Sequence, residues 1–164
     1  MSVAAATIER GEERRLALAR ALPLALLYGG LVGLYAWQAW VHRTPTLFTD
    51  ELEFTQLSRS IAESGEPTLR GAPVGWVGLY TWLAAPLWWL GDVGTAYGAI
   101  KLLGVLLMTA AVFPAYGLAR LVVSPPWALA AAAGAGMAPA LAYSPFLVEE
   151  PLAYPLSTLA LWLT

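Results

Sequence analysis

Two pairs of adjacent carboxylates are the residues of this sequence that could do chemistry: Asp50-Glu51 and Glu149-Glu150. Each pair lies at the edge of a long apolar stretch, where an ionisable side chain is costly and by default suggests function. Carboxylates that meet at one site can act as a general base or hold a hard divalent cation. We expect Glu149 to bind substrate. The expected catalytic residues are Asp50, Glu51 and Glu150.

A purely structural role is the alternative for both acidic pairs. Asp50 and Glu53 have the spacing of a helix capping box, so the acids of this turn could simply begin a helix. Glu149 and Glu150 precede Pro151, and the helix dipole favours acidic residues at a helix N-terminus. Both alternatives stay open at the level of the sequence.

Basic residues near the first acidic pair are candidates for holding a substrate. Guanidinium groups bind phosphate through paired hydrogen bonds, so we expect Arg59 and Arg70 to bind substrate, with an ordinary surface position as the alternative. The single histidine, His42, is expected at a membrane interface. The sequence has no cysteine, which excludes a thiolate metal site. The metal ligands stay unknown, and a divalent cation is the one cofactor that the carboxylates suggest.

The first acidic pair should begin an amphipathic helix. Phe54, Leu57 and Ile61 recur at helical spacing, and Gly65 supplies a stop. At about 100° per residue, Asp50 falls on the same stripe as these apolar side chains. We therefore expect Asp50 to face whatever the helix packs on, and not bulk water.

The composition indicates an integral membrane protein. Of the 164 residues, 59% are hydrophobic and 12% are charged, whereas soluble domains have roughly 25% charged residues. Mean hydropathy is +0.62. The net charge is −2 and basic residues cluster only near the N-terminus, so a nucleic-acid partner is not expected. The sequence therefore predicts an all-α, polytopic transmembrane protein.

The first apolar stretch predicts the orientation of the chain. Residues 1–20 form a charged arm with four arginines close to the first span, which predicts a cytoplasmic N-terminus. A membrane domain follows over residues 21–164, with its first span at about 21–41. Gly29, Gly30 and Gly33 would give this span a small-residue face for close helix packing. An extracytoplasmic loop should then cover residues 42–96.

The remaining apolar stretches predict further spans. Residues 73–90 are rich in tryptophan but interrupted by glycine and proline, which favours an interfacial segment over a span. Spans are expected at about 97–123 and 127–143. A helix over 151–164 is too short to cross a bilayer, so the chain is expected to be the front part of a longer protein. This arrangement places both acidic pairs on the extracytoplasmic face.

Several of these features together resemble the GT-C glycosyltransferases, which use polyprenyl-phosphate sugars and include protein O-mannosyltransferases and aminoarabinose transferases. Asp50-Glu51, followed by an aromatic residue, a small residue and a glycine, is similar to the start of the first external loop in that family. The apolar residues 73–91 and the segment 144–156, with Glu150 at the acidic position, resemble its later features. The resemblance covers roughly residues 20–164.

The resemblance implies an inverting transfer of a sugar from a polyprenyl-phosphate donor to an acceptor hydroxyl on an extracytoplasmic glycan, lipid or protein. Asp50 would be the general base, Glu51 would orient the site, and Glu150 would help to place the acceptor or a metal. Gly71-Ala72-Pro73 departs from the family, since many relatives have a lysine or histidine before this proline. Phosphate binding would then shift to Arg70. The expected localisation is the plasma membrane.

Two other classes of protein remain as alternatives. A non-catalytic membrane subunit or scaffold would use the acidic residues only as helix caps. One half of a transporter would place them in an ion path, although they fall at predicted helix ends and not near the middle of the bilayer. As a fragment, the chain is expected to be inactive alone.

Overall fold

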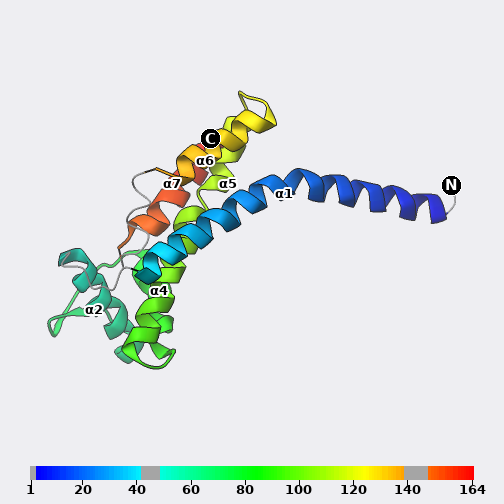
Figure 1. The fold of residues 1–164 in the computed structure, drawn as a ribbon. Coiled ribbons are helices and arrows are strands. Elements are labelled where there is room, and N and C mark those ends of the chain that lie inside the picture. The colour runs from blue at the N-terminus through cyan, green and yellow to red at the C-terminus, as the bar shows by residue number, and fades with distance from the viewer. Residues whose placement is uncertain (1–2, 42–48, 139–147) are drawn as a thin grey trace.

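The computed structural model describes residues 3–41, 49–138 and 148–164, and most of these are helical (Figure 1). The expected all-α class is confirmed, with one small hairpin as the exception. The α-helices are α1 (Val3–Val41), α2 (Thr49–Ser64), α3 (Leu79–Ala84), α4 (Val93–Thr109), α5 (Val112–Arg120), α6 (Pro125–Gly136) and α7 (Glu150–Leu163). The other elements are the strands β1 (Thr68–Leu69) and β2 (Ala72–Pro73) and the 3-10 helix η1 (Ala85–Trp89).

Two helical segments are long and apolar enough to cross a membrane: Ala21–Val41 and Val93–Arg120. Their mean hydropathies are 1.3 and 1.9. These two helical segments fit an association with a membrane, which is the more general part of the predicted transmembrane class. The described part of the predicted span at 127–143 is the 12-residue helix α6, which is shorter than a span requires. Residues 139–143 of that prediction lie outside the described residues.

The first helix differs from its predicted start. We expected a separate arm over residues 1–20, but the backbone forms one helix of 39 residues from Val3 to Val41. Alanine, glutamate, arginine and leucine dominate residues 3–20, and all four are strong helix formers. The N-terminal half of α1 projects away from the other helices in Figure 1.

The segment over residues 73–90 contains no continuous helix, as the non-spanning prediction requires. After β2 the chain forms the six-residue α3 and the five-residue η1, which includes Pro86. Proline has no N–H to continue a helical hydrogen-bond ladder, and such short pieces cannot cross a bilayer. The chain then turns at Gly91, whose φ of +113° is a backbone conformation that favours glycine.

The second candidate span is interrupted where α4 meets α5. Pro114 lies in the first turn of α5 and cannot donate a hydrogen bond to the carbonyl of Ala110. The N–H of Phe113 bonds to that carbonyl instead, at 3.1 Å, and Ala111 bonds to Met108 at 3.3 Å. These tighter bonds interrupt the α-helix at 110–111 while the chain continues in roughly the same direction.

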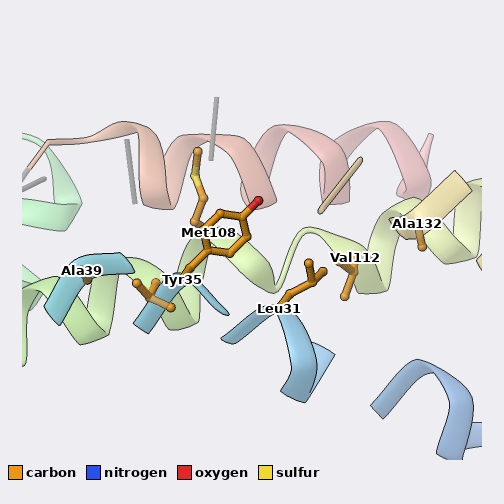
Figure 2. Close-up of a cluster of buried hydrophobic side chains, with 7 residues drawn as sticks. Leu31, Tyr35, Ala39, Met108, Val112 and Ala132 are labelled. Atoms are coloured by element: carbon orange, nitrogen blue, oxygen red, sulfur yellow. The ribbon is translucent and has the colours of Figure 1, made fainter. Parts of the chain in front are cut away.

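The main hydrophobic core joins α1 to α4, α5 and α6. On α1, Leu31, Tyr35 and Ala39 are buried and recur every four residues, so they share one face. The buried residues that face them are Val105, Met108, Val112 and Ala132 (Figure 2). The Tyr35 hydroxyl also donates a hydrogen bond of 3.0 Å to the carbonyl of Gly136 on α6.

The predicted glycine face of α1 does not pack on another helix within the described chain. Gly29, Gly30 and Gly33 are exposed, and a Cβ atom built on any of them would have no atom within 4 Å. Within the described residues the opposite face of α1, which includes Leu31 and Tyr35, packs on the other helices instead, because those two side chains fill the space between α1 and its neighbours.

The helices α1 and α4 run antiparallel. Tyr28 lies against Phe113, with ring centroids 5.0 Å apart, and its hydroxyl donates a 3.2 Å hydrogen bond to the carbonyl of Leu106. Farther along α1, Ala39 shares a pocket with Gly98 near the start of α4. The sequence numbers therefore rise on one helix as they fall on the other, as expected for two consecutive spans.

A second cluster brings the two acidic segments to one end of the molecule. Its buried residues are Tyr80, Ala84 and Ile100. Phe54, three residues after Glu51, and Leu152, two residues after Glu150, both pack against this cluster. Figure 1 shows the start of α7 at the same end as α2.

Candidate functional site

The buried centre of the site is Glu51, in the first turn of α2. Its side chain is fully buried, and its Oε1 atom accepts a hydrogen bond from the hydroxyl of Tyr97 on α4. The Lys101 ammonium is close enough to attract the Glu51 carboxylate and lies 5.7 Å from the centre of the Tyr97 ring. Lys101 is itself only 6% exposed. A charge-paired cluster therefore joins the acidic helix to a candidate membrane span.

The structure corrects the orientation expected for Asp50, because this side chain is exposed and Glu51 takes the buried position. The packing face of α2 is centred nearer to Ser58, which is fully buried and accepts a 2.9 Å hydrogen bond from Nε1 of Trp88. Glu51 precedes Ser58 by two helical turns and shares its face. The packing face of α2 was predicted from its apolar residues alone, so the prediction did not include the small polar residue Ser58.

The helix α2 ends as its sequence predicts. Gly65 has a φ of +79°, and its N–H bonds to the carbonyl of Ile61 at 2.8 Å. A left-handed residue directly after the last helical turn is a common helix stop. The indole N–H of Trp89 donates a 3.0 Å hydrogen bond to the carbonyl of Ala62 and so ties η1 to the end of α2.

A pocket of about 830 Å³ opens beside the Glu51 cluster, between the end of α1 and the start of α4. Small and apolar residues form most of its wall, and Asp92, Thr95, Tyr97 and Lys101 add polar atoms. Sequence reasoning gave no role to Tyr97 or Lys101. The signal that could have found them is the only lysine of the chain, placed one helical turn after a tyrosine in a predicted span.

Asp92 caps the helix that carries Tyr97 and Lys101. Its Oδ1 atom accepts hydrogen bonds from the N–H groups of Gly94 (2.8 Å) and Thr95 (3.2 Å), and Oδ2 accepts one from the Thr95 hydroxyl (2.7 Å). The bond from the Thr95 hydroxyl, followed by those from the backbone, lowers the pKa of Asp92 below its usual value. The cap thus fixes where α4 begins.

The two arginines expected to bind substrate lie on the surface. Arg59 forms an ion pair of 2.8 Å with Glu63, one turn later on α2, and both side chains are more than half exposed. Arg70 is exposed in the two-residue turn between β1 and β2, with a φ of +54° beside Gly71 at +83°. This turn needs two residues with positive φ, which gives Arg70 a structural position. Phosphate binding by either arginine stays a prediction.

The second acidic pair divides into one half-buried and one exposed side chain. Glu150 is exposed in the first turn of α7, where the helix dipole favours it. Glu149 caps α7 through its backbone, since its carbonyl accepts bonds from Leu152 and Ala153, both at 3.1 Å. Its carboxylate lies against Gly78 at the start of α3.

Within the described residues, no group of three or more histidine, cysteine, aspartate or glutamate side chains could hold a metal ion. The Glu51 carboxylate is already engaged by Tyr97 and Lys101. The described carboxylates therefore do not assemble the oxygen-rich ligand set that a divalent cation requires. The divalent cation stays a prediction with no ligand set assigned, and His42 lies outside the described residues.

The fold and site describe a helical protein with two candidate membrane spans and a cluster of buried Glu51, buried Lys101 and partly buried Tyr97 beside a pocket. No protein-family model, curated protein or solved structure matches this chain.

Proposed function

We propose that this chain is the N-terminal part of a GT-C-like membrane glycosyltransferase, which moves a sugar from a polyprenyl-phosphate donor to an extracytoplasmic hydroxyl. The observation that carries the proposal is the meeting of both acidic segments at one end of the candidate spans. Phe54 of α2 and Leu152 of α7 pack on the same cluster there. The pocket beside Glu51 lies at the same end.

The proposed placement is polytopic in the plasma membrane with a cytoplasmic N-terminus. The antiparallel course of α1 and α4 supports an outward first span and an inward second span. The acidic helix α2 then lies outside. The connecting segment would rest in the membrane interface through exposed apolar side chains on α3, η1 and their flanks. These are Trp76, Leu79, Trp82, Leu83, Trp89 and Leu90.

The two carboxylates of the first pair receive different roles. Asp50 is exposed, so an acceptor can reach it, and it acts as the general base. Glu51 is fully buried and held by Tyr97, so it positions the start of α2 and does not touch the substrate. This division keeps the role that the resemblance implies for Asp50 and makes Glu51 a positioning residue.

The pocket between α1 and α4 is the proposed donor site. Its apolar wall, which includes Ala36, Ala39 and Leu102, suits a prenyl chain. Lys101 lies in the same wall and can approach the anionic phosphate of such a lipid. The larger acceptor would approach from the side of Asp50 and Glu150, whose carboxylates are both exposed.

The proposed reaction is a single inverting displacement. Asp50 takes the proton of the acceptor hydroxyl as its oxygen forms a bond to the anomeric carbon of the sugar. The bond between that carbon and the phosphate oxygen of the donor breaks on the opposite face. The lipid phosphate leaves with the bonding electrons, so the products are the glycosylated acceptor and the free lipid phosphate.

The experiment is a transfer assay in membranes that contain the longer protein of which this chain would be the N-terminal part, with a radiolabelled polyprenyl-phosphate sugar as donor. Asp50→Asn should lower transfer by about 100-fold or more, which is the usual contribution of a general base. Glu53→Gln, one turn along the same helix, is the matched control and should retain transfer. Parental activity in a stably folded Asp50→Asn variant would contradict the role of Asp50. Absence of transfer by the parent would contradict the function.

A non-catalytic membrane subunit is the second candidate, because the Glu51–Tyr97–Lys101 cluster can be accounted for by a structural role alone, which is to hold α2 on α4. In that case Asp50→Asn and Glu150→Gln would leave the association with partner proteins intact. The stability of the protein would change little, since both side chains are exposed.

A further inference from the structure

The carboxylate of Glu149 occupies the space where a side chain at position 78 would begin. A Cβ atom built on Gly78 would overlap Oε1 and Cδ of Glu149 and would lie 2.7 Å from Oε2. Real Cβ atoms do not approach other atoms this closely, so any residue other than glycine must displace the carboxylate. Gly78 is buried and stands directly before the first residue of α3.

Within the described part of the chain, the Glu149 carboxylate contacts Gly78 by close packing and not through a hydrogen bond to Oε1. Oε1 of Glu149 is buried there without a hydrogen-bond partner, and so is the hydroxyl of Thr81, one turn farther along α3. The neighbours of Glu149 are also enclosed, since Val148 is 7% exposed and Pro151 is fully buried. The residue before α7 therefore packs against the residue before α3 through a close approach that glycine permits.

We infer that Gly78 is a positioning residue, which seats the Glu149 carboxylate and thereby fixes the second acidic pair next to the loop between the candidate spans. The inference rests on the proposed function only where it connects this acidic pair with sugar transfer. The docking itself is independent of any reaction. Gly75 provides a matched position, because a Cβ atom there would meet nothing within 4 Å in the described chain.

The docking can be measured by thiol labelling, because the sequence contains no cysteine. Val148→Cys places one thiol at a buried position beside Glu149, and its reaction with N-ethylmaleimide in native membranes should be slow. Adding Gly78→Ala should speed this labelling about 10-fold, the ratio expected when the docked state loses about 1.4 kcal/mol. Adding Gly75→Ala should leave the rate unchanged.

Shortening the acidic side chain should reverse the effect of Gly78→Ala. Glu149→Asp retracts the carboxylate by one methylene, and Glu149→Ala removes it, so both should restore slow labelling in the Gly78→Ala background. Only Glu149→Asp keeps the charge and should also restore sugar transfer. Equal labelling of the Gly78→Ala and Gly75→Ala variants would overturn the inference, as would failure of both shortened side chains to restore protection.

If the Gly78→Ala variant accumulates poorly, the amount of protein in the membrane can be measured in place of the labelling rate. Recovery of the protein level by adding Glu149→Ala would support the contact between Gly78 and the Glu149 carboxylate, and no recovery would overturn the inference. Labelling reports the docking whether or not sugar is transferred. Normal protection of Val148→Cys, together with absence of transfer by the longer protein, would therefore refute the proposed function and leave the role of Gly78 standing.

Discussion

Tyr97 donates the hydrogen bond of its phenol to the carboxylate of Glu51, a residue 46 positions earlier in the chain. The bond joins the first turn of α2 to the second turn of α4. Lys101, one turn beyond Tyr97, supplies the opposite charge. These polar contacts hold the acidic helix α2 on a candidate membrane span. Their loss should therefore lower the stability of the folded protein more directly than it lowers any transfer activity.

Replacing Lys101 by methionine should destabilise the protein strongly. Glu51 would keep its buried charge without its cationic partner, which typically costs about 3–5 kcal/mol. The double variant Glu51→Gln/Lys101→Met should recover much of this loss, because no uncompensated charge remains. Thermal unfolding in detergent would measure both effects. Equal destabilisation by the single and double variants would show that the charge pair is not the cause.

Gly136→Ala should weaken the contact between α1 and α6. A Cβ atom at this position would lie 2.5 Å from Cδ1 of Leu31 and 2.9 Å from Cγ1 of Val112, and such overpacking costs about 1–3 kcal/mol. Gly134→Ala is the control on the same helix, with nothing within 4 Å in the described chain. It should instead stabilise by roughly 0.5–1 kcal/mol through helix propensity. If the unfolding midpoints of Gly136→Ala and Gly134→Ala shifted in the same direction from that of the parent protein, the packing of Gly136 against Leu31 and Val112 would be contradicted.

The cap at Asp92 should give the protein a stability that depends on acidic pH. The folded-state pKa of Asp92 is lowered, so its contribution is complete above the unfolded value of 3.8 and is lost as pH falls through the lower folded value. Asp92→Asn keeps a capping side chain that does not titrate in this range. Melting temperatures of parent and variant should therefore converge as the pH falls below 3.8. A constant difference across that range would exclude the cap as its source.

Thiol labelling of intact cells should place the two ends of the second candidate span on opposite sides of the membrane. Gln56 on α2 and Ser124 after α5 are both exposed in the structure, which makes them suitable for single-cysteine variants. Gln56→Cys should react with a membrane-impermeant maleimide from outside, and Ser124→Cys only after the cells are opened. Reaction of both from outside would mean that residues 93–120 do not cross the membrane.

Much of the local structure was predictable because its causes lie in neighbouring residues. The spacing of Phe54, Leu57 and Ile61 predicted the helix α2, and Gly65 ends it through a positive φ. The glycines and Pro86 between residues 73 and 90 predicted that this stretch would not form a spanning helix, and it does not. Propensity and backbone sterics act over a few residues, so a sequence carries these signals directly.

Which side chains face one another was decided by tertiary structure alone. The sequence favoured Asp50 for the buried face of α2, but Trp88 and Tyr97 approach this helix on the side of Ser58 and bury Glu51 instead. The partners lie 30 and 46 positions away from the residues they bond. Helical spacing determines which residues share a face, whereas the face that is buried depends on the shape and hydrogen bonds of distant segments, and no local pattern encodes them.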